Sequence, residues 1–323
     1  MHSFLSRRKV LVASIFLVVV ISGELFCRQI LGLGNPPLYV ADSKIEYMMK
    51  TDQDVRRFGN HLLVNHWGMR SPDFPKHKKN PDEIRILIVG DSVVNGGNET
   101  DQELLATSLL QHRLQESFGR PVIVGNVSAG SWGPGNWLAY VQHYGFFDAD
   151  LLVLVVNSGD FADNPTFEPL DSNHPTQTPI LALQEAIFRY LPGYLPSFSK
   201  STSGQVVSVS PVAAAQGMSD LRQFLKLSQA DEGRKVLMFH HPYRTEFLDN
   251  KFSAGHDEMR ALAMELGVSF TELFPAYSKV GVSMYRDDIH PNVQGQKIIS
   301  EELYEVILPN LKSLRSTLSE ASQ

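Results

Sequence analysis

The chain has 323 residues, of which 43% are hydrophobic, 10% aromatic and 20% charged, and its formal net charge is −6. This composition is ordinary for a folded protein of one large or two small domains. No concentrated basic run is present, which argues against a nucleic-acid partner. The single cysteine, Cys27, excludes an intramolecular disulfide and any zinc site built on several cysteines.

The N-terminal segment is the first informative one. Arg7, Arg8 and Lys9 precede an apolar run over residues 10–21, and apolar residues return at 25–27. Residues 10–27 approach the length of a membrane-spanning helix, and the leading basic flank predicts that residue 1 is cytoplasmic and that the chain after about residue 30 lies outside. A cleaved signal peptide and a buried core helix are the alternatives. Because no Ala-x-Ala site follows the run, we favour an uncleaved single-pass anchor in the cytoplasmic (inner) membrane.

Residues 31–80 are polar and interrupted by prolines, and we interpret them as an N-terminal extension lying on the main domain, with a strand-like piece at 61–64 and a turn at 65–70. A regular alternation follows. Strands are expected at 84–89, 121–127, 151–156, 235–239 and 268–270, and helices at 101–118, 136–147, 218–228, 258–266 and 293–311. This pattern predicts a three-layer α/β/α domain over residues 81–312, with a parallel sheet between two helical layers and a tail at 313–323.

An insertion of about residues 165–216 separates the third strand from the fourth and is rich in proline. A long irregular connection of this kind is typical of a lid, a binding loop or a disordered segment. We expect a helix within residues 180–190 and a flexible Ser/Val-rich stretch at 200–210.

Two loops at the carboxyl edge of the predicted sheet contain the residue types of a serine nucleophile and its base. Gly90-Asp91-Ser92 follows the first strand, where a serine hydroxyl would lie at the rim of the sheet. Asp287 and His290 precede the last helix, and they could supply the base and its orienting carboxylate that a serine nucleophile needs. Read separately, the first loop is also a common helix cap, and the second a common surface turn.

Two further loops lie at the same edge. Residues 126–134 follow the second strand and residues 157–160 the third, and their small side chains would let the backbone approach a substrate. An exposed amide of the first loop, with the Asn157 side chain from the second, could form an oxyanion hole. Either segment alone is equally consistent with ordinary loop chemistry.

Taken in order, these segments resemble the four blocks of the SGNH/GDSL hydrolase family, from about residue 84 to the final helix. The resemblance implies a flavodoxin-like three-layer fold, a catalytic triad of Ser92, Asp287 and His290, and the Ser92 amide as one oxyanion donor. Asp288 lies one residue too close to His290 to fit the pattern.

Two departures from the family pattern concern the oxyanion hole. The second block's glycine falls in register on Ser131, with Gly130 beside it, and serine is tolerable there because the donor is a backbone amide. The third block's asparagine position is occupied by Gly159, and Asn157 stands two residues early. Positions two apart on a strand face the same side, so Asn157 could still reach the site. Otherwise one donor is missing.

The leader, with its 65–70 segment, resembles that of membrane-anchored SGNH proteins of bacterial surface-polysaccharide systems, which implies an acylated carbohydrate or another small ester as substrate. Asp91, Trp132 and His241 are candidate substrate-lining residues, although Trp132 could equally pack in the core. The pair His240-His241 could line the cleft, cap its strand or bind a metal with Asp160. Adjacent strand residues face opposite sides, which disfavours joint ligation, so we expect no metal and no cofactor.

Two functions of different classes remain at this point. The first is a serine ester hydrolase outside the cytoplasm, or an acyl transferase if a sugar hydroxyl replaces water. The second is a catalytically weak, anchored protein that binds glycan or scaffolds a polysaccharide system. The altered third block is the feature that favours the second.

Overall fold

The architecture was taken from a computed structural model, which describes residues 2–191, 209–231 and 233–321. Its centre is a five-stranded parallel sheet in the order β6-β5-β7-β8-β9, which is the flavodoxin-like order 2-1-3-4-5. The predicted three-layer α/β/α class is therefore confirmed. The strands are β5 (Ile84–Gly90), β6 (Val122–Ser128), β7 (Leu151–Val156), β8 (Lys235–His240) and β9 (Ser269–Glu272).

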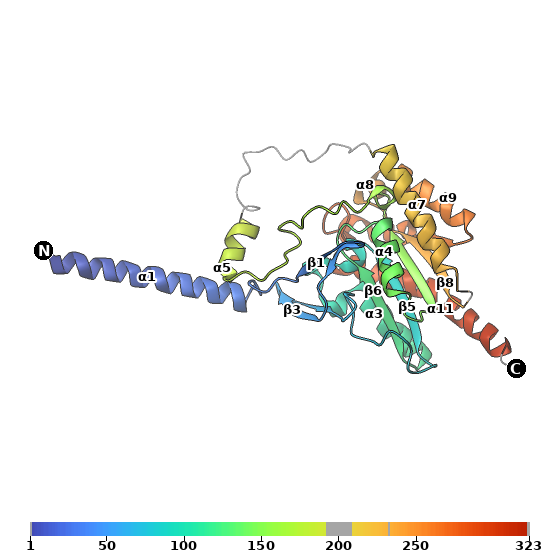
Figure 1. The fold of residues 1–323 in the computed structure, drawn as a ribbon, viewed down its shortest axis with the longest axis horizontal. Coiled ribbons are helices and arrows are strands. Elements are labelled where there is room, and N and C mark those ends of the chain that lie inside the picture. Colours follow the sequence, from blue (N-terminus) through green and yellow to red (C-terminus); the bar gives the residue numbers. More distant parts are fainter. Residues whose placement is uncertain (1, 192–208, 232, 322–323) are drawn as a thin grey trace.

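Both faces of the sheet are covered by helices (Figure 1). Alternate residues of β5 supply the two cores: Ile86 and Ile88 pack toward one face, and Leu87 and Val89 toward the other. The first core is closed by α3 (Ala106–Phe118) and α11 (Val293–Ala321), and the second by α4 (Pro134–Tyr144), α7 (Pro211–Ser228) and α9 (Ala254–Glu265).

Several helix boundaries differ from the predicted ones for identifiable reasons. Asp101 accepts a hydrogen bond from the Glu103 amide and caps a separate 3-10 turn, so α3 begins at Ala106 and not at residue 101. Pro134 and Pro211 lie in the first turns of α4 and α7, where proline is favoured, so both helices begin earlier than predicted. The last helix continues through Pro309 to Ala321, beyond the predicted end at residue 311.

Short elements fill the connections between these helices and strands. They are α2 (Ser92–Asn95), η1 (Gly97–Glu99), η2 (Gln102–Leu104), η3 (Asp160–Ala162), α5 (Ala182–Glu185), η4 (Ala186–Tyr190), α8 (Arg244–Asp249), α10 (Phe274–Tyr277) and η5 (Gly281–Met284). The helix expected within residues 180–190 is thus α5 continued by the π-turn η4. Most of the predicted flexible stretch at 200–210 lies outside the described residues.

The N-terminal extension forms two antiparallel hairpins, β1 (Tyr39–Asp42) with β2 (Glu46–Met49) and β3 (Gln53–Arg57) with β4 (Asn60–Val64). The extension packs on the sheet domain, because Ile45, Met48 and Met69 belong to the same core cluster as Leu87 of β5. The Arg70 side chain is fully buried and donates to the carbonyl oxygens of Asn95, Gly97 and Thr100, just after α2.

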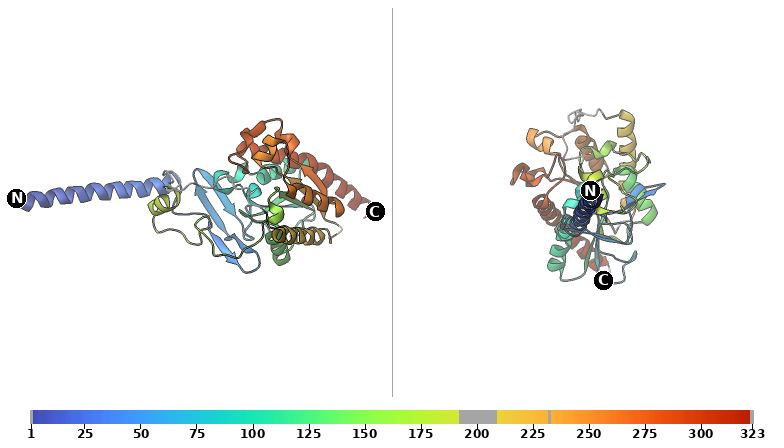
Figure 2. Two further views of the ribbon diagram at one scale, coloured as in Figure 1. Left: turned by 90° about the horizontal axis from the view of Figure 1, so that it is seen from above. Right: turned by 90° about the vertical axis from the view of Figure 1, so that its left-hand side faces the viewer.

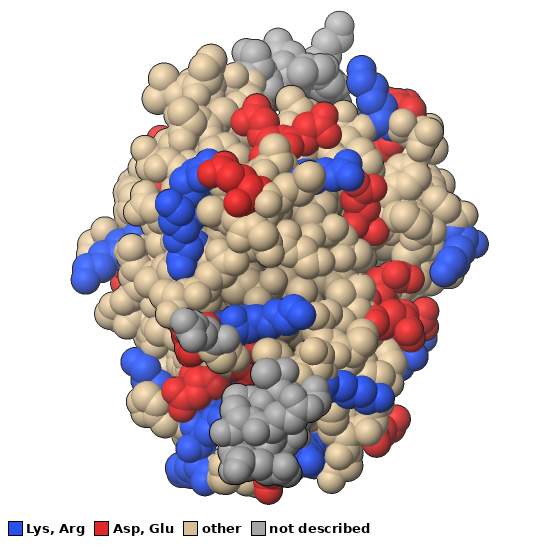
Figure 3. All heavy atoms as spheres, turned by 90° about the vertical axis from the view of Figure 1, so that its right-hand side faces the viewer, with Lys and Arg blue, Asp and Glu red and all other residues tan. Residues whose placement is uncertain are grey.

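The N-terminal helix α1 (His2–Gln29) projects away from the rest of the molecule, and the C-terminus lies at the opposite end (Figures 1 and 2). Arg7–Gln29 has a mean hydropathy of 2.5, and 6% of its most apolar window is buried, so its length and composition suit a membrane span or a signal sequence. This exposure contradicts the alternative of a buried core helix. On the face opposite α1, acidic and basic side chains are interspersed, with no basic field (Figure 3).

Candidate active site

Ser92 lies at the corner between β5 and α2. Asp91 caps α2 by accepting a hydrogen bond from the Val93 amide at 2.8 Å, and the Trp137 indole donates to the Gly90 carbonyl oxygen at 3.0 Å. Gly90 is required by close packing, since a Cβ there would lie 2.9 Å from the Val155 carbonyl oxygen. The corner therefore presents the Ser92 hydroxyl at the carboxyl edge of the sheet.

His290 reaches this hydroxyl from the loop before α11. Its Nε2 lies 2.8 Å from Ser92 Oγ, and its Nδ1 lies 2.8 Å from Asp287 Oδ2. The loop is closed on itself, because the Arg286 amide donates to the His290 carbonyl oxygen and Tyr285 pairs with Pro291. Segments 198 residues apart in the chain thus meet at one rim of the sheet.

Asp287 is held as a carboxylate by its neighbours. Partial burial raises its pKa, but hydrogen bonds from the His290 and Ile289 amides and from the His290 imidazole outweigh this effect and lower the pKa to about 2. An ionised Asp287 accepts the Nδ1 proton of His290, which leaves the Nε2 lone pair free to accept the Ser92 hydroxyl proton. This arrangement suits general-base activation of a serine.

A cleft of about 620 Å³ opens beside these three residues. Loops after β5, β6 and β7 form one wall, and the insertion contributes another through Asn173 and His174. A second cavity of about 250 Å³ adjoins the cleft, sharing Ser131, Asp163 and His174 with it. The cleft is lined by Asp91, Ser92, Gly130, Ser131, Asn157, Gly159, Asp160, Ala162, Asp163, Asn173, His174, Val209, Tyr243, Ile289 and His290.

The backbone donors expected for an oxyanion lie in this cleft. Gly130 and Ser131 follow β6 and line the cleft with Ser92, and Ser131 has a left-handed backbone with φ of 56°. The Gly130 carbonyl is turned the other way, since it accepts a hydrogen bond from the Tyr47 hydroxyl of the extension. In the described part of the chain, none of the amides of Ser92, Gly130 and Ser131 has a hydrogen-bond acceptor.

Asn157 lines the same cleft, but its side-chain amide is already engaged. Its Nδ2 donates to Asp91 Oδ2 at 2.9 Å and to Asp160 Oδ1 at 2.7 Å, which uses both amide hydrogens. Its Oδ1 accepts from the Gly159 amide at 2.7 Å. The expectation that Asn157 donates to an oxyanion is therefore not met in this arrangement, because the two carboxylates compete for the same donors.

Asp91 and Asp160 form a buried acidic pair bridged by Asn157. Burial raises the pKa of both carboxyl groups, and the negative charge of Asp91 raises that of Asp160 further. Two like charges this close to one another in a buried site disfavour double ionisation. Through Asn157, the pair holds the loop after β7 against the corner that carries Ser92.

A third carboxyl group, that of Asp163, also lines the cleft. Burial, together with the charges of Asp91 and Glu46, raises the pKa of Asp163 to about 6. Its neutral form is the one that the fold favours, so its stabilising contribution is complete below the ordinary pKa of 3.8 and is lost as the pH rises through about 6.

For this reason Asp163→Asn should increasingly raise the melting temperature relative to the wild type as the pH rises from about 4 to about 6, and the difference should level off above that. The measurement is differential scanning calorimetry of both proteins across that range. The exposed residue Asp249 offers a control variant, Asp249→Asn, which removes a carboxyl group outside the cleft. A constant difference for Asp163→Asn would contradict the assignment.

Two of the candidate lining residues are placed elsewhere. Trp132 is 2% exposed, belongs to the core and donates through its indole to the Tyr47 carbonyl oxygen, so it cannot stack on a substrate. His241 is fully buried and does not line the cleft. Asp91 does line the cleft, as expected. The two errors share a cause, because sequence position near the rim does not reveal which way a side chain points.

His241 instead supports the loop that carries His290. Burial lowers its pKa to about 4, so its imidazole is neutral, with Nε2–H donating to the Ile289 carbonyl oxygen at 2.7 Å and Nδ1 accepting from the Tyr277 hydroxyl at 2.7 Å. Its neighbour His240 faces the opposite side and pairs with Ser158. The expected opposition of the two rings is thus observed.

Replacement of His241 by leucine should lower kcat by about tenfold and the free energy of unfolding by about 1–3 kcal/mol, because two buried polar partners lose their hydrogen bonds. Ester turnover and denaturant titration measure the two effects. His241→Asn restores a donor and should recover part of the loss. Unchanged kcat in the leucine variant would show that the loop is positioned without His241.

Several residues that support or line the candidate site were not identified from the sequence. Gln296 of α11 is fully buried, donates to the Val93 carbonyl oxygen at 3.1 Å and accepts from the Ala106 amide at 2.9 Å. It joins α11 and α3 to α2, which carries Ser92. Asp163 and His174 line both cavities. A lone glutamine in an amphipathic helix carries no signal of such a role.

Among the residues that the structure describes, no three His, Cys, Asp or Glu side chains are grouped so that they could hold a metal ion. The Asp160 carboxylate accepts a hydrogen bond from the Asn157 side chain, and His240 Nε2 is hydrogen-bonded to the Ser158 hydroxyl.

Comparisons with known proteins give matches among solved structures only. No family model and no curated protein sequence matches the chain. The matched structures include TesA, with 20% identity over 71% of this chain and 99% of that one and a TM-score of 0.46. A lipolytic protein of the G-D-S-L family from Veillonella parvula matches with 11% identity over 69% of this chain and 97% of that one, with a TM-score of 0.44. The acetyl xylan esterase AlAXEase matches with 16% identity over 69% of this chain and 100% of that one, also with a TM-score of 0.44.

Proposed function

We propose that this protein is a serine ester hydrolase of the SGNH/GDSL type. The observation that carries the proposal is the contact of 2.8 Å between Ser92 Oγ and His290 Nε2, with Asp287 on the other imidazole nitrogen. In this proposal Ser92 is the nucleophile, His290 the general base and acid, and Asp287 the group that fixes the imidazole tautomer.

The reaction has two steps. Ser92 Oγ attacks the acyl carbonyl carbon while its proton passes to His290 Nε2, and the tetrahedral oxyanion accepts hydrogen bonds from the amides of Ser92 and of Ser131 or Gly130. The oxyanion collapses, the ester C–O bond breaks, and the leaving alkoxide takes the proton from His290. Water then attacks the acyl-enzyme with His290 again as base, which releases the acid. A sugar hydroxyl in place of this water would give acyl transfer.

An acylated carbohydrate is the proposed substrate class, acted on outside the cytoplasm by a protein anchored through α1. The resemblance of the leader to surface-polysaccharide proteins supports this class, and the open cleft of about 620 Å³, whose lining includes Asp91, Asn173 and His174, accommodates a sugar unit. In the proposed organisation, residues 1–30 are the anchor and cytoplasmic tip, 31–80 the extension, 81–312 the hydrolase domain with its insertion at about 165–216, and 313–323 a tail.

A serine-directed p-nitrophenyl phosphonate tests the proposed nucleophile directly. Attack by Ser92 Oγ on phosphorus with loss of p-nitrophenolate should add the phosphonyl mass once per chain, and peptide mapping should place it on Ser92. An acetylated oligosaccharide should slow the labelling by occupying the cleft. Labelling of another residue, or none, contradicts the proposed mechanism.

The engagement of Asn157 with Asp91 and Asp160 favours a second candidate, a catalytically weak glycan-binding or scaffold protein. Loss of one oxyanion donor typically costs about 10²–10³ in rate. This candidate predicts glycan binding by calorimetry without phosphonate labelling, whereas the hydrolase predicts both.

A further inference from the structure

Residues 180–191, which comprise α5, η4 and their flanking residues, lie against the end of α1. The Glu24 carboxylate of α1 accepts hydrogen bonds from the Ala182 amide at 3.0 Å and the Leu183 amide at 2.8 Å. Arg28 of α1 donates to the Ile180 carbonyl oxygen at 2.9 Å. We call residues 180–191 the docking segment. These contacts fix its position relative to the last two turns of α1.

The docking segment is also tied to the body of the protein. Glu185 forms a buried ion pair with Arg57 of β3 and accepts from the Gly34 amide at 2.6 Å. Ala182 is fully buried in a small apolar cluster with Cys27 and Leu33. The segment is therefore a fixed connection between α1 and the extension.

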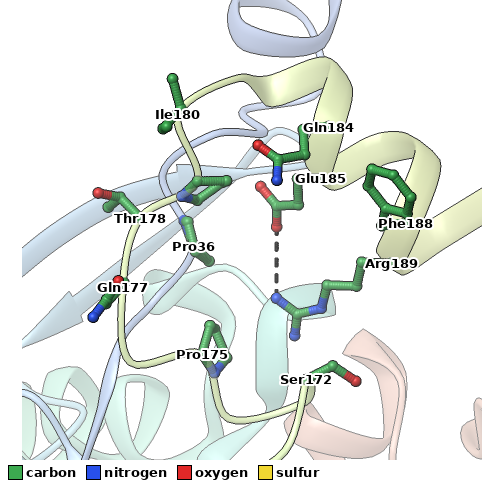
Figure 4. Close-up of a pocket in the computed structure, with 11 residues that line it drawn as sticks. Pro36, Ser172, Pro175, Gln177, Thr178, Ile180, Gln184, Glu185, Phe188 and Arg189 are labelled. Atoms are coloured by element: carbon green, nitrogen blue, oxygen red, sulfur yellow. Dashed lines mark ion pairs between the residues drawn. The ribbon is translucent and has the colours of Figure 1, made fainter.

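Its outer side is strongly apolar. Ile180 is 86% exposed and Phe188 75% exposed, and Leu181, Ile187 and Leu191 are exposed as well. Ile180 and Phe188 line an open, mostly apolar cavity of about 460 Å³, whose wall also includes Pro36 and Pro175 (Figure 4). Clustered exposed apolar side chains of this size mark an interaction surface and not ordinary protein surface.

The position of this surface identifies its partner. Residues 10–27 of α1 span about 27 Å at 1.5 Å per residue, close to the roughly 30 Å of a bilayer hydrocarbon core. The docking segment contacts Gly23, Glu24, Cys27 and Arg28, at the outer end of this span. The docking segment thus lies beside the outer end of α1 (Figure 1), and both carry exposed apolar side chains. If α1 spans the bilayer, this end of the helix is at the level where hydrocarbon meets headgroups.

We propose that the docking segment inserts its apolar side chains, led by Ile180 and Phe188, into the outer interface of the bilayer that α1 spans. This inference rests on the proposed anchoring by α1. The loop that leads to the segment lines the cleft with Asn173 and His174 and the cavity with Ser172 and Pro175. Docking therefore holds the Ser92 cleft at a fixed height above the membrane, facing acyl esters borne at or near its surface.

The test uses the full chain in phospholipid vesicles with Cys27, its only cysteine, replaced by alanine. A single bimane label is placed by Phe188→Cys, by Val18→Cys on α1, or by Met264→Cys on α9, where the native residues are 75%, 62% and 69% exposed. One set of vesicles contains lipid with a nitroxide near the headgroup end of the acyl chain, for the label at 188, and a second set carries it near the methyl end, for the label at 18 in the middle of the span. Circular dichroism verifies the fold of each variant.

Nitroxide lipid should quench the label at 188 at least about threefold more than the label at 264, and aqueous iodide should quench it less. Equal behaviour of the two labels, with Val18→Cys quenched by lipid, would overturn the docking proposal while keeping the anchor. No lipid quenching at 18 would overturn the anchor and the docking together. Protection of 188 from iodide without lipid quenching would assign the surface to a second copy of the chain. Ester turnover is measured separately, so none of these outcomes depends on the proposed hydrolase activity.

Discussion

Replacement of Ser92 by alanine is expected to lower kcat/KM for p-nitrophenyl acetate by about 10⁴-fold or more. The reason is geometric: the Ser92 hydroxyl contacts His290 Nε2 and is the proposed nucleophile. Truncation at this site removes one hydrogen bond of a partly buried side chain, so the melting temperature should change by only a few degrees. Steady-state turnover with the purified full chain measures the first effect, and calorimetry the second.

The matched control is Ser278→Ala, at an exposed serine that only caps its own helix turn by donating to the Phe274 carbonyl oxygen. This variant should retain wild-type turnover. Comparable activity in Ser92→Ala and wild type would show that another group, or a contaminant, is responsible for any observed hydrolysis. In that case the glycan-binding candidate becomes the better description of the protein.

Replacement of Asp287 by asparagine should lower kcat by about 10²–10⁴ with little change in KM. An amide cannot stabilise the imidazolium that forms on His290, and its NH₂ group favours the tautomer whose Nε2 carries the proton. The expected loss is smaller than for Ser92 because the Asp287 side chain is 48% exposed and water can replace part of its effect.

The neighbouring carboxylate provides the control for this experiment. Asp288 is exposed, and the hydrogen bond recorded for it is accepted by its backbone carbonyl from the Arg244 amide. Asp288→Asn should therefore keep at least about half of the wild-type kcat, as surface substitutions usually do. Equal losses of kcat in the two variants would show that activity depends on the net charge of the loop, and that the contact of Asp287 with the imidazole makes no specific contribution.

The sheet was predictable because its evidence is periodic and local. Uninterrupted apolar runs such as residues 151–156 become strands with every side chain buried, and the alternation with helices fixes the parallel order. The meeting of Ser92 with the loop of Asp287 and His290 follows from the same rule, since the carboxyl ends of parallel strands share one edge.

The errors lie where tertiary contacts decide. Asn157 faces the cleft as its strand position indicated, but its amide is used by Asp160 and by a carboxylate 66 residues away in the sequence. Whether a donor is free is a property of its neighbours and has no local signal. The same reason applies to His241 and Trp132, because each side chain is hydrogen-bonded to a backbone carbonyl oxygen inside the protein and does not reach the cleft.

The Arg70 guanidinium has a consequence for how this protein can be shortened. It donates to three carbonyl oxygens at and after the end of α2, the helix that begins at Ser92, and burial lowers its pKa to about 10, so the group remains charged at neutral pH. A fragment starting at residue 81, where the strand-helix alternation begins, would leave these acceptors unsatisfied and strip the cover from one face of the sheet. The hairpins before that point are thus part of the scaffold of the proposed active site, and an expression fragment that lacks only the N-terminal helix should retain all of them.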